Sequence, residues 1–531
     1  MSKVSNLLSK RRIGRSLAFS GVLLINLISS GYAQEYGYRL AEDAVATVWW
    51  AKGAYKVMKD DPPPNKRSPE IRIECARNEY EPFILILRPK QRMEEIRVEM
   101  IPLRTRKGAA SSVLEASICR VEYVRVSVPT DGFGKAGEYR GSVRLSSGDW
   151  RQEIAVIVDV RNFALPKTSS IRSSFGLSTE DIKRYHNLET REEVEKVTDL
   201  YYQNLRDHRL APTSPLDLSL EGLATGSFYS QQEGIFVGFR QGTPEYDRLL
   251  GQYLRLVEKH LEEKGWLGKE YIYWFDEPDP ENYPFIREGM MAIRRAAPRL
   301  TRFITEHGPR PDIMDVSEIS CTIFHRVDPS VVAELSLKGR EFWSYLCTGP
   351  KTPWVTLFID HPAVNLRLWP WMSYQYGLKG ILVWRANYWS SPTVFPADHV
   401  QNPWKDPMSY TVGYGTPYGQ VNYWGNGDGR FRYPPNRDPN CDRPKYLCGP
   451  INSVRWEILR EGVEDYEYFR LLERAVRQAP PAKKDLAKKG HALLQVPPSV
   501  FRSGQDYAQD PQALLDHRHR MGEVLEKLLA R

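Results

Sequence analysis

Short runs of alternating hydrophobic and polar residues fill the chain from about residue 36 to residue 166. Runs of this length, separated by turn-rich pieces and without a helical period, are typical of β-strands. Asp131-Gly132 and Gly148-Asp149 mark turns, and Leu165-Pro166 ends the region. The pattern predicts an antiparallel β-sandwich domain over residues 36–166. Its clearest strand candidates are Glu70–Cys75, Pro82–Leu87, Arg97–Ile101, Glu122–Val128, Ser142–Leu145 and Glu153–Val160.

After residue 171, apolar strand-like runs alternate with longer helical patterns. The clearest helix runs from Pro244 to about Lys264, because Thr243 is a good N-cap and apolar residues then recur near a helical period. This alternation predicts parallel βα units, so we expect a (β/α)8-type barrel over residues 171–480, although fewer than eight pairs are convincing. The strand candidates are Ser173–Leu177, Tyr271–Phe275, Arg302–Thr305, Ile319–Phe324, Phe342–Leu346 and Gly380–Trp384.

The C-terminal part changes character twice. Residues 401–450 are rich in Pro, Gly, Asn and Asp, which predicts long loops. Helical patterns return at Ser453–Arg477 and Pro511–Ala530, and we expect residues 481–531 to form a helical tail packed on the barrel. With 531 residues, 41% of them hydrophobic, the chain is too long for a single core, in keeping with two domains.

The first 33 residues resemble an export signal. Basic residues precede the apolar run Ser16–Ser30, and Gly31-Tyr32-Ala33 supplies the small residues that a signal peptidase reads. The residues after Arg11-Arg12 lack the hydrophobic pattern of the twin-arginine route, which favours the general secretory route. An uncleaved anchor is the alternative. We therefore expect an exported protein that is periplasmic, at the cell surface or secreted, with no membrane span after signal removal.

Charge and cysteine content exclude several classes of function. The formal charge of +8 includes five basic residues before position 34, so the remaining surplus is small and a nucleic-acid partner is not indicated. The six cysteines make disulfides possible without fixing their pairing, and none has the spacing of a zinc site. No nucleotide-binding fingerprint or serine elbow is present, so we expect no metal and no cofactor.

Two adjacent acids end an apolar strand. The run Tyr271–Phe275 leads directly into Asp276 and Glu277 and then stops at Pro278. In parallel βα folds the active site lies at the carboxyl ends of the strands, where two acids can be given different protonation states. Neighbouring strand residues point in opposite directions, so this pair is poorly placed to act as an ordinary acid and nucleophile. It suits substrate-assisted glycoside hydrolysis, although an Asp-Glu dipeptide also occurs by chance in solvated loops.

Tryptophans are concentrated in one part of the predicted barrel. Eight of the 14 tryptophans lie between positions 343 and 424. Aromatic faces pack on sugar rings while amide and hydroxyl groups bind sugar hydroxyls, which makes Trp384, Asn387 and Trp389 sugar-binding candidates. Core packing is the alternative for this cluster, and we prefer it for Trp369 and Trp371.

Other polar residues are weaker candidates. His307, His325 and Asp360 follow strand-like segments and can line a site, but single residues of this kind are more often structural. The acids of Glu464–Glu467 lie inside a strong helical pattern, which predicts a solvated or helix-capping face.

Six segments are informative when taken together in chain order. They are Ala76–Phe83, the strand ending in Asp276-Glu277-Pro278, Phe342–Tyr345, Gly380–Trp389, Gly449–Arg455 and Arg460–Tyr468. Together they resemble glycoside hydrolase family 123 and its relatives. The resemblance implies an N-terminal β-sandwich, a (β/α)8 barrel and retaining β-N-acetylgalactosaminidase activity. By position, it implies that Asp276 polarises the 2-acetamido group and that Glu277 is the general acid/base, and it makes Trp343 and Tyr345 substrate-binding candidates.

The predicted function is therefore hydrolysis of β-linked 2-acetamido sugars in a glycan or glycoconjugate, with N-acetylgalactosaminides preferred. Two alternatives stay open. The fold can serve as a non-catalytic carbohydrate-binding or surface-scaffold protein, or Glu277 can work with a distant carboxylate such as Asp360 on a hexose without an acetamido group. The sequence leaves the linkage and the oligomeric state open.

Overall fold

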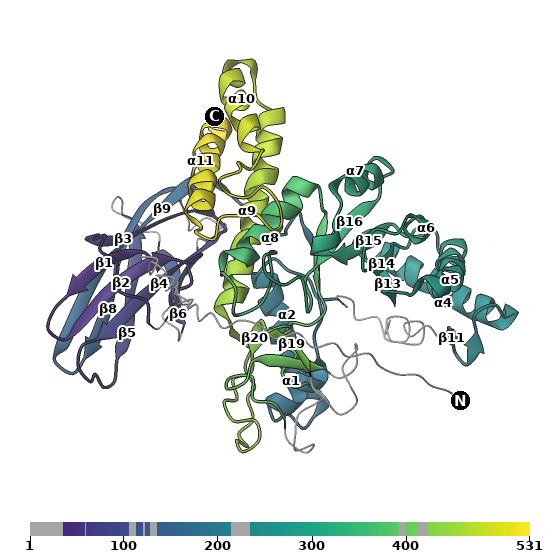
Figure 1. Cartoon of the computed structure of the whole chain (residues 1–531), viewed down its shortest axis with the longest axis horizontal. Helices are drawn as coiled ribbons and strands as arrows, with labels where there is room; N and C mark the ends of the chain where they lie inside the picture. Colours follow the sequence, from purple (N-terminus) through teal and green to yellow (C-terminus); the bar gives the residue numbers. More distant parts are fainter. Residues whose placement is uncertain are drawn as a thin grey trace, which may run out of the picture.

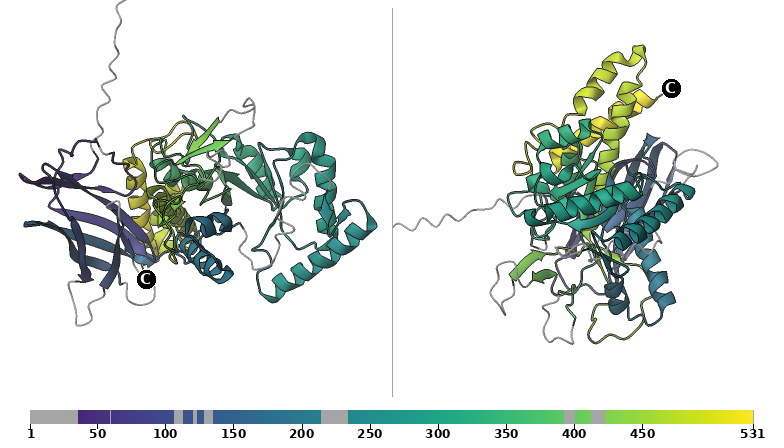
Figure 2. Two further views of the ribbon diagram at one scale, coloured as in Figure 1. Left: turned by 90° about the horizontal axis from the view of Figure 1, so that it is seen from below. Right: turned by 90° about the vertical axis from the view of Figure 1, so that its right-hand side faces the viewer.

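The structure is a computed structural model that describes residues 36–58, 60–105, 113–119, 123–127, 135–213, 234–391, 400–411 and 422–530. The expected export signal and the predicted turn at Asp131-Gly132 lie outside the described residues. An N-terminal β-sheet stands at one end of the molecule and a parallel sheet with its helices at the other (Figures 1 and 2). The C-terminal helices lie between these two parts in both figures.

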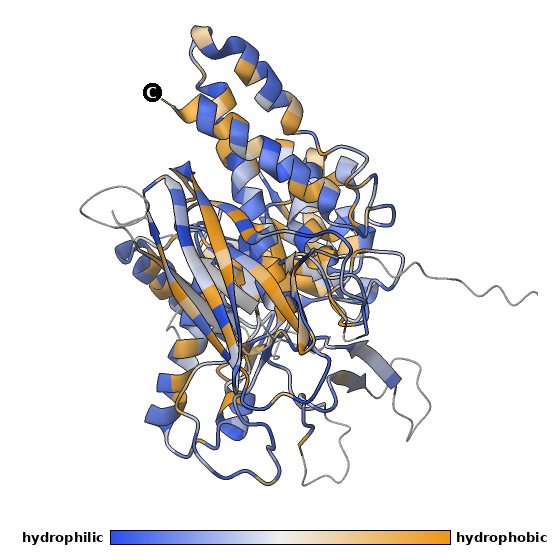
Figure 3. Ribbon diagram, turned by 90° about the vertical axis from the view of Figure 1, so that its left-hand side faces the viewer, coloured by the Kyte–Doolittle hydropathy of each residue, from blue (hydrophilic) through white to orange (hydrophobic). Residues whose placement is uncertain are grey.

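Nine strands build the N-terminal part and hydrogen-bond in the order β1-β2-β4-β7-β6-β5-β8-β9-β3. Residues from β2 and β4 share one apolar core with residues from β3, β8 and β9, and Figure 3 shows the polar–apolar alternation of these strands. All strand candidates of this region are confirmed as strands, but the hydrogen bonds form one continuous sheet, so a sandwich of two separate sheets is not confirmed. The strands are β1 (Tyr38–Glu42), β2 (Ala46–Lys52), β3 (Glu70–Arg77), β4 (Tyr80–Pro89), β5 (Arg97–Thr105), β6 (Val113–Cys119), β7 (Tyr123–Ser127), β8 (Gly137–Ser147) and β9 (Trp150–Ala164).

Six parallel strands form the second sheet, in the order β10-β17-β16-β15-β14-β13. They curl into a half-barrel, whereas the sequence pattern predicts eight strands. The difference arises because the long segments after β10 and β17 carry helices, loops and short two-stranded pairings instead of further strands of this sheet in the residues described. The six strands are β10 (Arg172–Phe175), β13 (Ile272–Asp276), β14 (Arg302–Glu306), β15 (Ile319–Ile323), β16 (Glu341–Tyr345) and β17 (Gly380–Val383).

Short pairings complete the strand inventory of the described residues. Three antiparallel pairs lie outside the two large sheets, and the pair β18–β19 approaches the end of β17 through Trp424. These strands are β11 (Ile235–Phe236), β12 (Phe239–Arg240), β18 (Met408–Thr411), β19 (Asn422–Asn426), β20 (Arg432–Tyr433) and β21 (Ile451–Asn452).

The helices follow the predicted patterns closely. Helix α4 begins at Pro244 after the N-cap Thr243, whose hydroxyl accepts a hydrogen bond from the Tyr246 amide at 3.3 Å. Its apolar face packs with α5 and the strands β13 and β14 in one core. The helices are α1 (Thr179–Tyr185), α2 (Arg191–Asp207), α4 (Pro244–Glu263), α5 (Tyr283–Ala296), α6 (Pro311–Met314), α7 (Pro329–Leu337), α8 (Val364–Tyr376), α9 (Val454–Arg477), α10 (Lys484–Leu493) and α11 (Gln512–Leu529). None of the helices in these ranges is long and apolar enough to cross a membrane.

Helix α9 is charged and almost completely buried, which corrects the prediction that the acids of Glu464–Glu467 face solvent. Asp465 accepts hydrogen bonds from Arg367 Nε at 2.6 Å and from the Trp371 indole at 2.9 Å. Arg518 of α11 lies 2.7 Å from Asp465 and also pairs with Glu79 and Glu81 of the N-terminal sheet. The acids are buried because arginines from other elements neutralise them. This cluster therefore connects the half-barrel, the N-terminal sheet and the C-terminal helices.

We expect Arg518→Met to lower the free energy of unfolding by roughly 3–5 kcal/mol, because it leaves buried carboxylates without their cation. Chemical denaturation monitored by circular dichroism measures this loss. Arg520→Met is the matched control on the exposed face of the same helix, and it should change stability by no more than about 0.5 kcal/mol. Equal stability of the two variants would contradict this account of the cluster.

Candidate active site

Asp276 ends β13 with its carboxylate held in place. Its Oδ1 accepts hydrogen bonds from the hydroxyls of Tyr273 and Thr305. Thr305 is the register partner of Asp276 on β14, and Tyr273 belongs to the core on the concave side of the half-barrel. The two hydroxyls orient the Asp276 carboxylate at the carboxyl edge of the sheet, where βα folds build their sites.

Glu277 takes an unusual backbone conformation that changes the direction of its side chain. Its φ is 45°, in the left-handed region, and its amide donates to the Thr305 carbonyl and hydroxyl oxygens, both at 3.1 Å. Its Oε1 accepts a hydrogen bond from Tyr345 at the end of β16, a residue of the same concave core. Extended neighbours would point to opposite faces. The left-handed turn instead brings both adjacent carboxylates to one side of the sheet, a backbone state that costs roughly 1–3 kcal/mol and is characteristic of functional sites.

The surroundings of Glu277 favour its protonated form. Burial raises the pKa of its carboxyl group, and the neighbouring Asp276 carboxylate raises it further, while the Tyr345 hydrogen bond and His307 act in the opposite direction. The His307 Nε2 lies 3.3 Å from Glu277 Oε2 on the open side of the site, with its side chain 76% exposed. Burial and the Glu277 carboxylate raise the pKa of Tyr345, so its phenol stays a hydrogen-bond donor. A carboxyl group with a raised pKa is suited to general acid catalysis.

Glu306 is a second acid of this region, and the sequence analysis missed it. It ends β14 and is 5% exposed, and the Tyr283 hydroxyl donates to its Oε2 at 3.4 Å. Burial raises the pKa of Glu306 to about 8, against the effect of Arg310. Thr305 and Tyr273 were missed as well. Their position along the chain was the available signal, because Thr305 is the last residue of a strand candidate and Tyr273 lies three residues before Asp276.

Trp384 extends the site along the sheet edge. It follows β17, the neighbour of β16, and its ring stacks on Trp424 of β19 with 5.5 Å between centroids and 15° between planes. The Trp384 indole donates to Asp428 Oδ1 at 3.3 Å, and the Thr348 amide donates to the other oxygen of this buried carboxylate. Trp384 is partly buried, and the Tyr388 ring also lies against it, with 4.9 Å between centroids.

Three predicted sugar-binding residues are fully buried and are removed from the candidate site. Trp343 packs inside the half-barrel, and its indole donates to Glu341 at 2.9 Å. Asn387 uses its side-chain amide on the backbone of Ser178, with two hydrogen bonds of 2.9 Å. The Trp389 indole donates to the Arg432 carbonyl at 2.7 Å in another core. Each polar group is already used inside the protein, so none is presented to a ligand.

The three weaker candidates, His307, Asp360 and His325, lie in different parts of the structure. His307 lies at Glu277, whereas the exposed Asp360 accepts a hydrogen bond from Asn426 at 2.7 Å, and His325 packs edge-to-face on Trp354 at 5.7 Å. Within the described ranges, no group of three or more His, Cys, Asp or Glu side chains is placed to hold a metal ion. The cysteines Cys75, Cys321, Cys347, Cys441 and Cys448 are free thiols.

Residues 227–472 match the model of the glycoside hydrolase 123 catalytic domain. Over this range the chain is similar to glycoside hydrolase family 123 catalytic domains. The matched range includes β13 to β17 and therefore Asp276, Glu277, Tyr345 and Trp384. No curated protein matches the sequence of the chain.

One solved structure shares the fold of this chain. A family 123 glycoside hydrolase from Clostridium perfringens, solved in a study of glycolipid glycan hydrolysis, is 12% identical, with a TM-score of 0.59 over 91% of this chain and 97% of that chain. A family 2 glycosyl hydrolase from Bacteroides cellulosilyticus is 8% identical over 70% of this chain and 47% of that one, with a TM-score of 0.25. An Ig-like domain containing GH10 xylanase from termite gut is 10% identical over 75% and 100%, also with a TM-score of 0.25.

Proposed function

We propose that the protein is a retaining glycoside hydrolase that cleaves β-linked 2-acetamido-2-deoxy sugars, with N-acetylgalactosaminides preferred, by substrate assistance. The observation that carries this proposal is the placement of two adjacent carboxylates on one side of a strand end. Asp276 is oriented by two hydroxyls, and burial raises the pKa of Glu277. Adjacent residues are too close to flank a glycosidic bond as acid and nucleophile, so we assign the role of nucleophile to the acetamido group of the substrate.

The chemistry follows from these positions. Asp276 accepts a hydrogen bond from the acetamido N–H and turns the amide oxygen toward the anomeric carbon. That oxygen bonds to the carbon as the glycosidic bond breaks, and Glu277 gives its proton to the departing oxygen. Glu277 then takes a proton from water, which attacks the same carbon and reopens the ring, so the two inversions retain the β configuration. Trp384 supplies an aromatic face for a sugar ring at the neighbouring strand end.

We expect Tyr345→Phe to move the alkaline limb of the pH–rate profile to higher pH. The general acid works only while Glu277 holds its proton, so activity falls as the pH rises through the pKa of Glu277. The Tyr345 hydroxyl lowers that pKa by stabilising the carboxylate, so its removal raises the pKa. The measurement is kcat/KM against pH for both proteins. Tyr374→Phe, on α8, is the control, and a limb that stays in place or moves to lower pH in Tyr345→Phe would contradict the assignment.

Two inhibitors separate this proposal from its alternatives. A thiazoline analogue of N-acetylgalactosamine mimics the ring formed by substrate assistance and should inhibit competitively, whereas a 2-deoxy-2-fluoro glycoside should leave the protein unlabelled. Labelling of a carboxylate by the fluoro glycoside would support a hexose glycosidase with a protein nucleophile. Glycan binding that survives both Asp276→Asn and Glu277→Gln, with no product formed, would support a binding protein.

Export belongs to the same proposal. The basic residues, the apolar run and the small residues before Gln34 support secretion with signal cleavage. N-terminal sequencing of the protein purified from its native cells tests this directly. A mature N-terminus at Gln34 is expected, and an intact Met1 would leave an uncleaved anchor or no export.

A further inference from the structure

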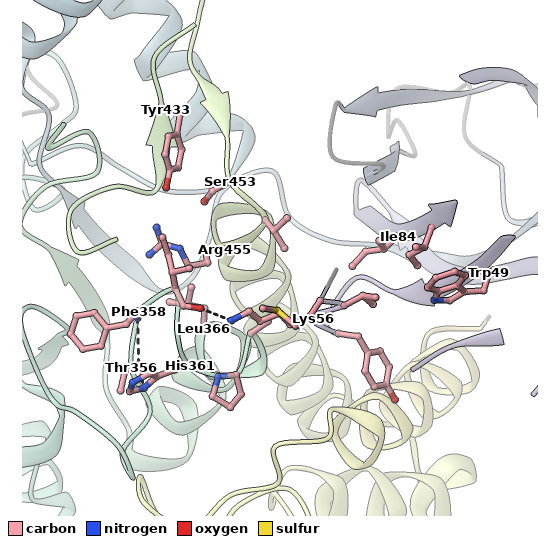
Figure 4. A pocket seen from close by; sticks show the side chains of 18 of the residues that line it. Trp49, Lys56, Ile84, Thr356, Phe358, His361, Leu366, Tyr433, Ser453 and Arg455 are labelled. Atoms are coloured by element: carbon pink, nitrogen blue, oxygen red, sulfur yellow. Dashed lines mark hydrogen bonds between the residues drawn. The ribbon is translucent and has the colours of Figure 1, made fainter. Parts of the chain in front are cut away.

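A cavity of about 740 Å³ lies between the N-terminal sheet and the half-barrel, apart from the Asp276–Glu277 site. Figure 4 shows Trp49 and Ile84 of the N-terminal sheet on one side of it, and Phe358, Leu366 and Arg455 on the other. The exposed Met58 also belongs to the lining, so the cavity reaches the surface. Its volume lies in the range of roughly 300–1,000 Å³ that is usual for small-molecule sites.

The lining combines apolar and cationic side chains without acidic or amide side chains. Most of it is apolar, and it includes the cationic side chains of Lys56, Arg88 and Arg455 but no Asp, Glu, Asn or Gln. Sugar sites usually combine hydroxyl groups with amides or carboxylates, as the candidate active site has at Asp276 and Glu277, whereas this lining offers only the hydroxyls of Tyr55, Thr356, Tyr433 and Ser453. A cationic ligand needs a carboxylate partner. The composition of this cavity therefore disfavours both and favours an anion attached to an apolar body.

Lys56 is the cation with free hydrogen-bonding capacity. Its Nζ donates to the Ile359 carbonyl at 2.5 Å, one bond of the three that an ammonium group can donate (Figure 4). The Arg455 guanidinium, in contrast, already donates hydrogen bonds to the backbone carbonyls of Leu357, Gly427 and Arg430, at 2.6–3.0 Å. Among the described residues, neither side chain forms an ion pair with a carboxylate.

Two carboxylates outside the lining, Asp428 and Asp360, act on the Arg455 guanidinium, although burial still lowers its pKa. Burial lowers the pKa of Lys56, and Asp360 opposes this shift only from outside the lining, where it is bonded to Asn426. His361 adds no fixed charge, because burial lowers its pKa and its ring is bonded to the Thr356 hydroxyl at 2.9 Å. An anionic ligand group beside Lys56 would therefore give this ammonium group an ion-pair partner that the described residues do not provide.

We propose that this cavity is a binding site for an anionic amphiphile of the fatty-carboxylate type, with its head group at Lys56 and its hydrocarbon chain against Val57, Ile86 and Leu87, which are partly exposed apolar residues of the lining. The apolar walls remove the chain from water, and the ammonium group pairs with the head group. The occupied cavity would connect the sheet to the half-barrel, so the ligand should stabilise the folded protein. This site is independent of the proposed hydrolysis.

The first experiment compares head groups on the unaltered full chain. Dodecanoate, dodecanol and dodecyltrimethylammonium are titrated separately below their micelle concentrations, by calorimetry and by thermal unfolding. We expect saturable 1:1 binding of dodecanoate with a rise in Tm, and binding of dodecyltrimethylammonium at least tenfold weaker. Equal binding of the two ions would show an adventitious detergent effect and overturn the proposal, as would the absence of saturable dodecanoate binding.

Two variants then locate the ligand. Lys56→Met keeps the length of the side chain without its charge, and it should weaken dodecanoate binding about tenfold. Lys66→Met, an exposed lysine of the same region, is the matched control and should bind as the unaltered chain does. Ile86→Trp fills the cavity and should abolish binding. Unchanged affinity in folded Lys56→Met and Ile86→Trp would place the ligand elsewhere and overturn the assignment.

Discussion

Glu277→Gln is expected to lower turnover by roughly 10²–10⁴-fold on N-acetylgalactosaminides with poor leaving groups, because the glutamine has no proton to give to the departing oxygen. The loss should be much smaller with a dinitrophenyl leaving group, which departs without protonation. The measurement is kcat/KM for a series of aryl glycosides whose leaving groups differ in pKa. A steep dependence on leaving-group pKa in the variant and a shallow one in the unaltered enzyme identify the general acid.

Glu281→Gln is the matched control for this substitution. Glu281 lies four residues further on, in the exposed turn η1 (Pro280–Asn282), and the structure gives it no contact with the carboxylate pair. It should keep the activity of the unaltered enzyme. Near-normal turnover of Glu277→Gln on poor leaving groups would remove Glu277 from the reaction.

Asp276→Asn is expected to reduce turnover by a comparable factor for a different reason. The asparagine oxygen can still accept the hydrogen bonds of Tyr273 and Thr305, so the strand end should keep its shape. The amide carries no charge to polarise the acetamido group, and the nucleophile is weakened. Because this substitution weakens the acetamido oxygen as a nucleophile and not the protonation of the leaving group, the loss of turnover should persist with a dinitrophenyl leaving group, unlike the loss in Glu277→Gln.

Asp279→Asn is the matched control, because it also removes one negative charge close to the pair, at an exposed residue outside the strand. It should leave kcat/KM within about twofold of the unaltered enzyme, as expected for a surface substitution away from the chemistry. If Asp276→Asn recovers full activity on the dinitrophenyl substrate, Asp276 serves protonation of the leaving group and the division of roles proposed for the pair is wrong.

Local patterns predicted the elements that position the pair. The strand before Asp276 and the helix after Thr243 were readable because apolar periodicity and capping residues act over a few positions. The adjacent acids were readable for the same reason. The sequence did not show that the two carboxylates point to the same side of the sheet. That arrangement depends on the left-handed φ of Glu277 and on its hydrogen bonds with Thr305 and Tyr345, which are distant in sequence.

Long-range pairing explains the predictions that were wrong. Asp465 looks solvated in a helical pattern, and only the approach of Arg367 and Arg518 from other elements allows it to be buried. Asn387 and Trp389 look like ligand-binding residues, but backbone groups of distant segments use their polar atoms. The sequence pattern also predicted eight barrel strands where the described residues form six, because alternation shows the type of unit and not whether the sheet closes.

The most direct test of the proposed reaction is the hydrolysis of two substrates by the unaltered protein. 4-Nitrophenyl N-acetyl-β-galactosaminide and 4-nitrophenyl β-galactoside share a leaving group and a ring configuration and differ only in the acetamido group. Substrate assistance predicts rapid release of nitrophenol from the first and at least a hundredfold slower release from the second. Equal or faster hydrolysis of the β-galactoside would contradict the mechanism and require a nucleophile in the protein.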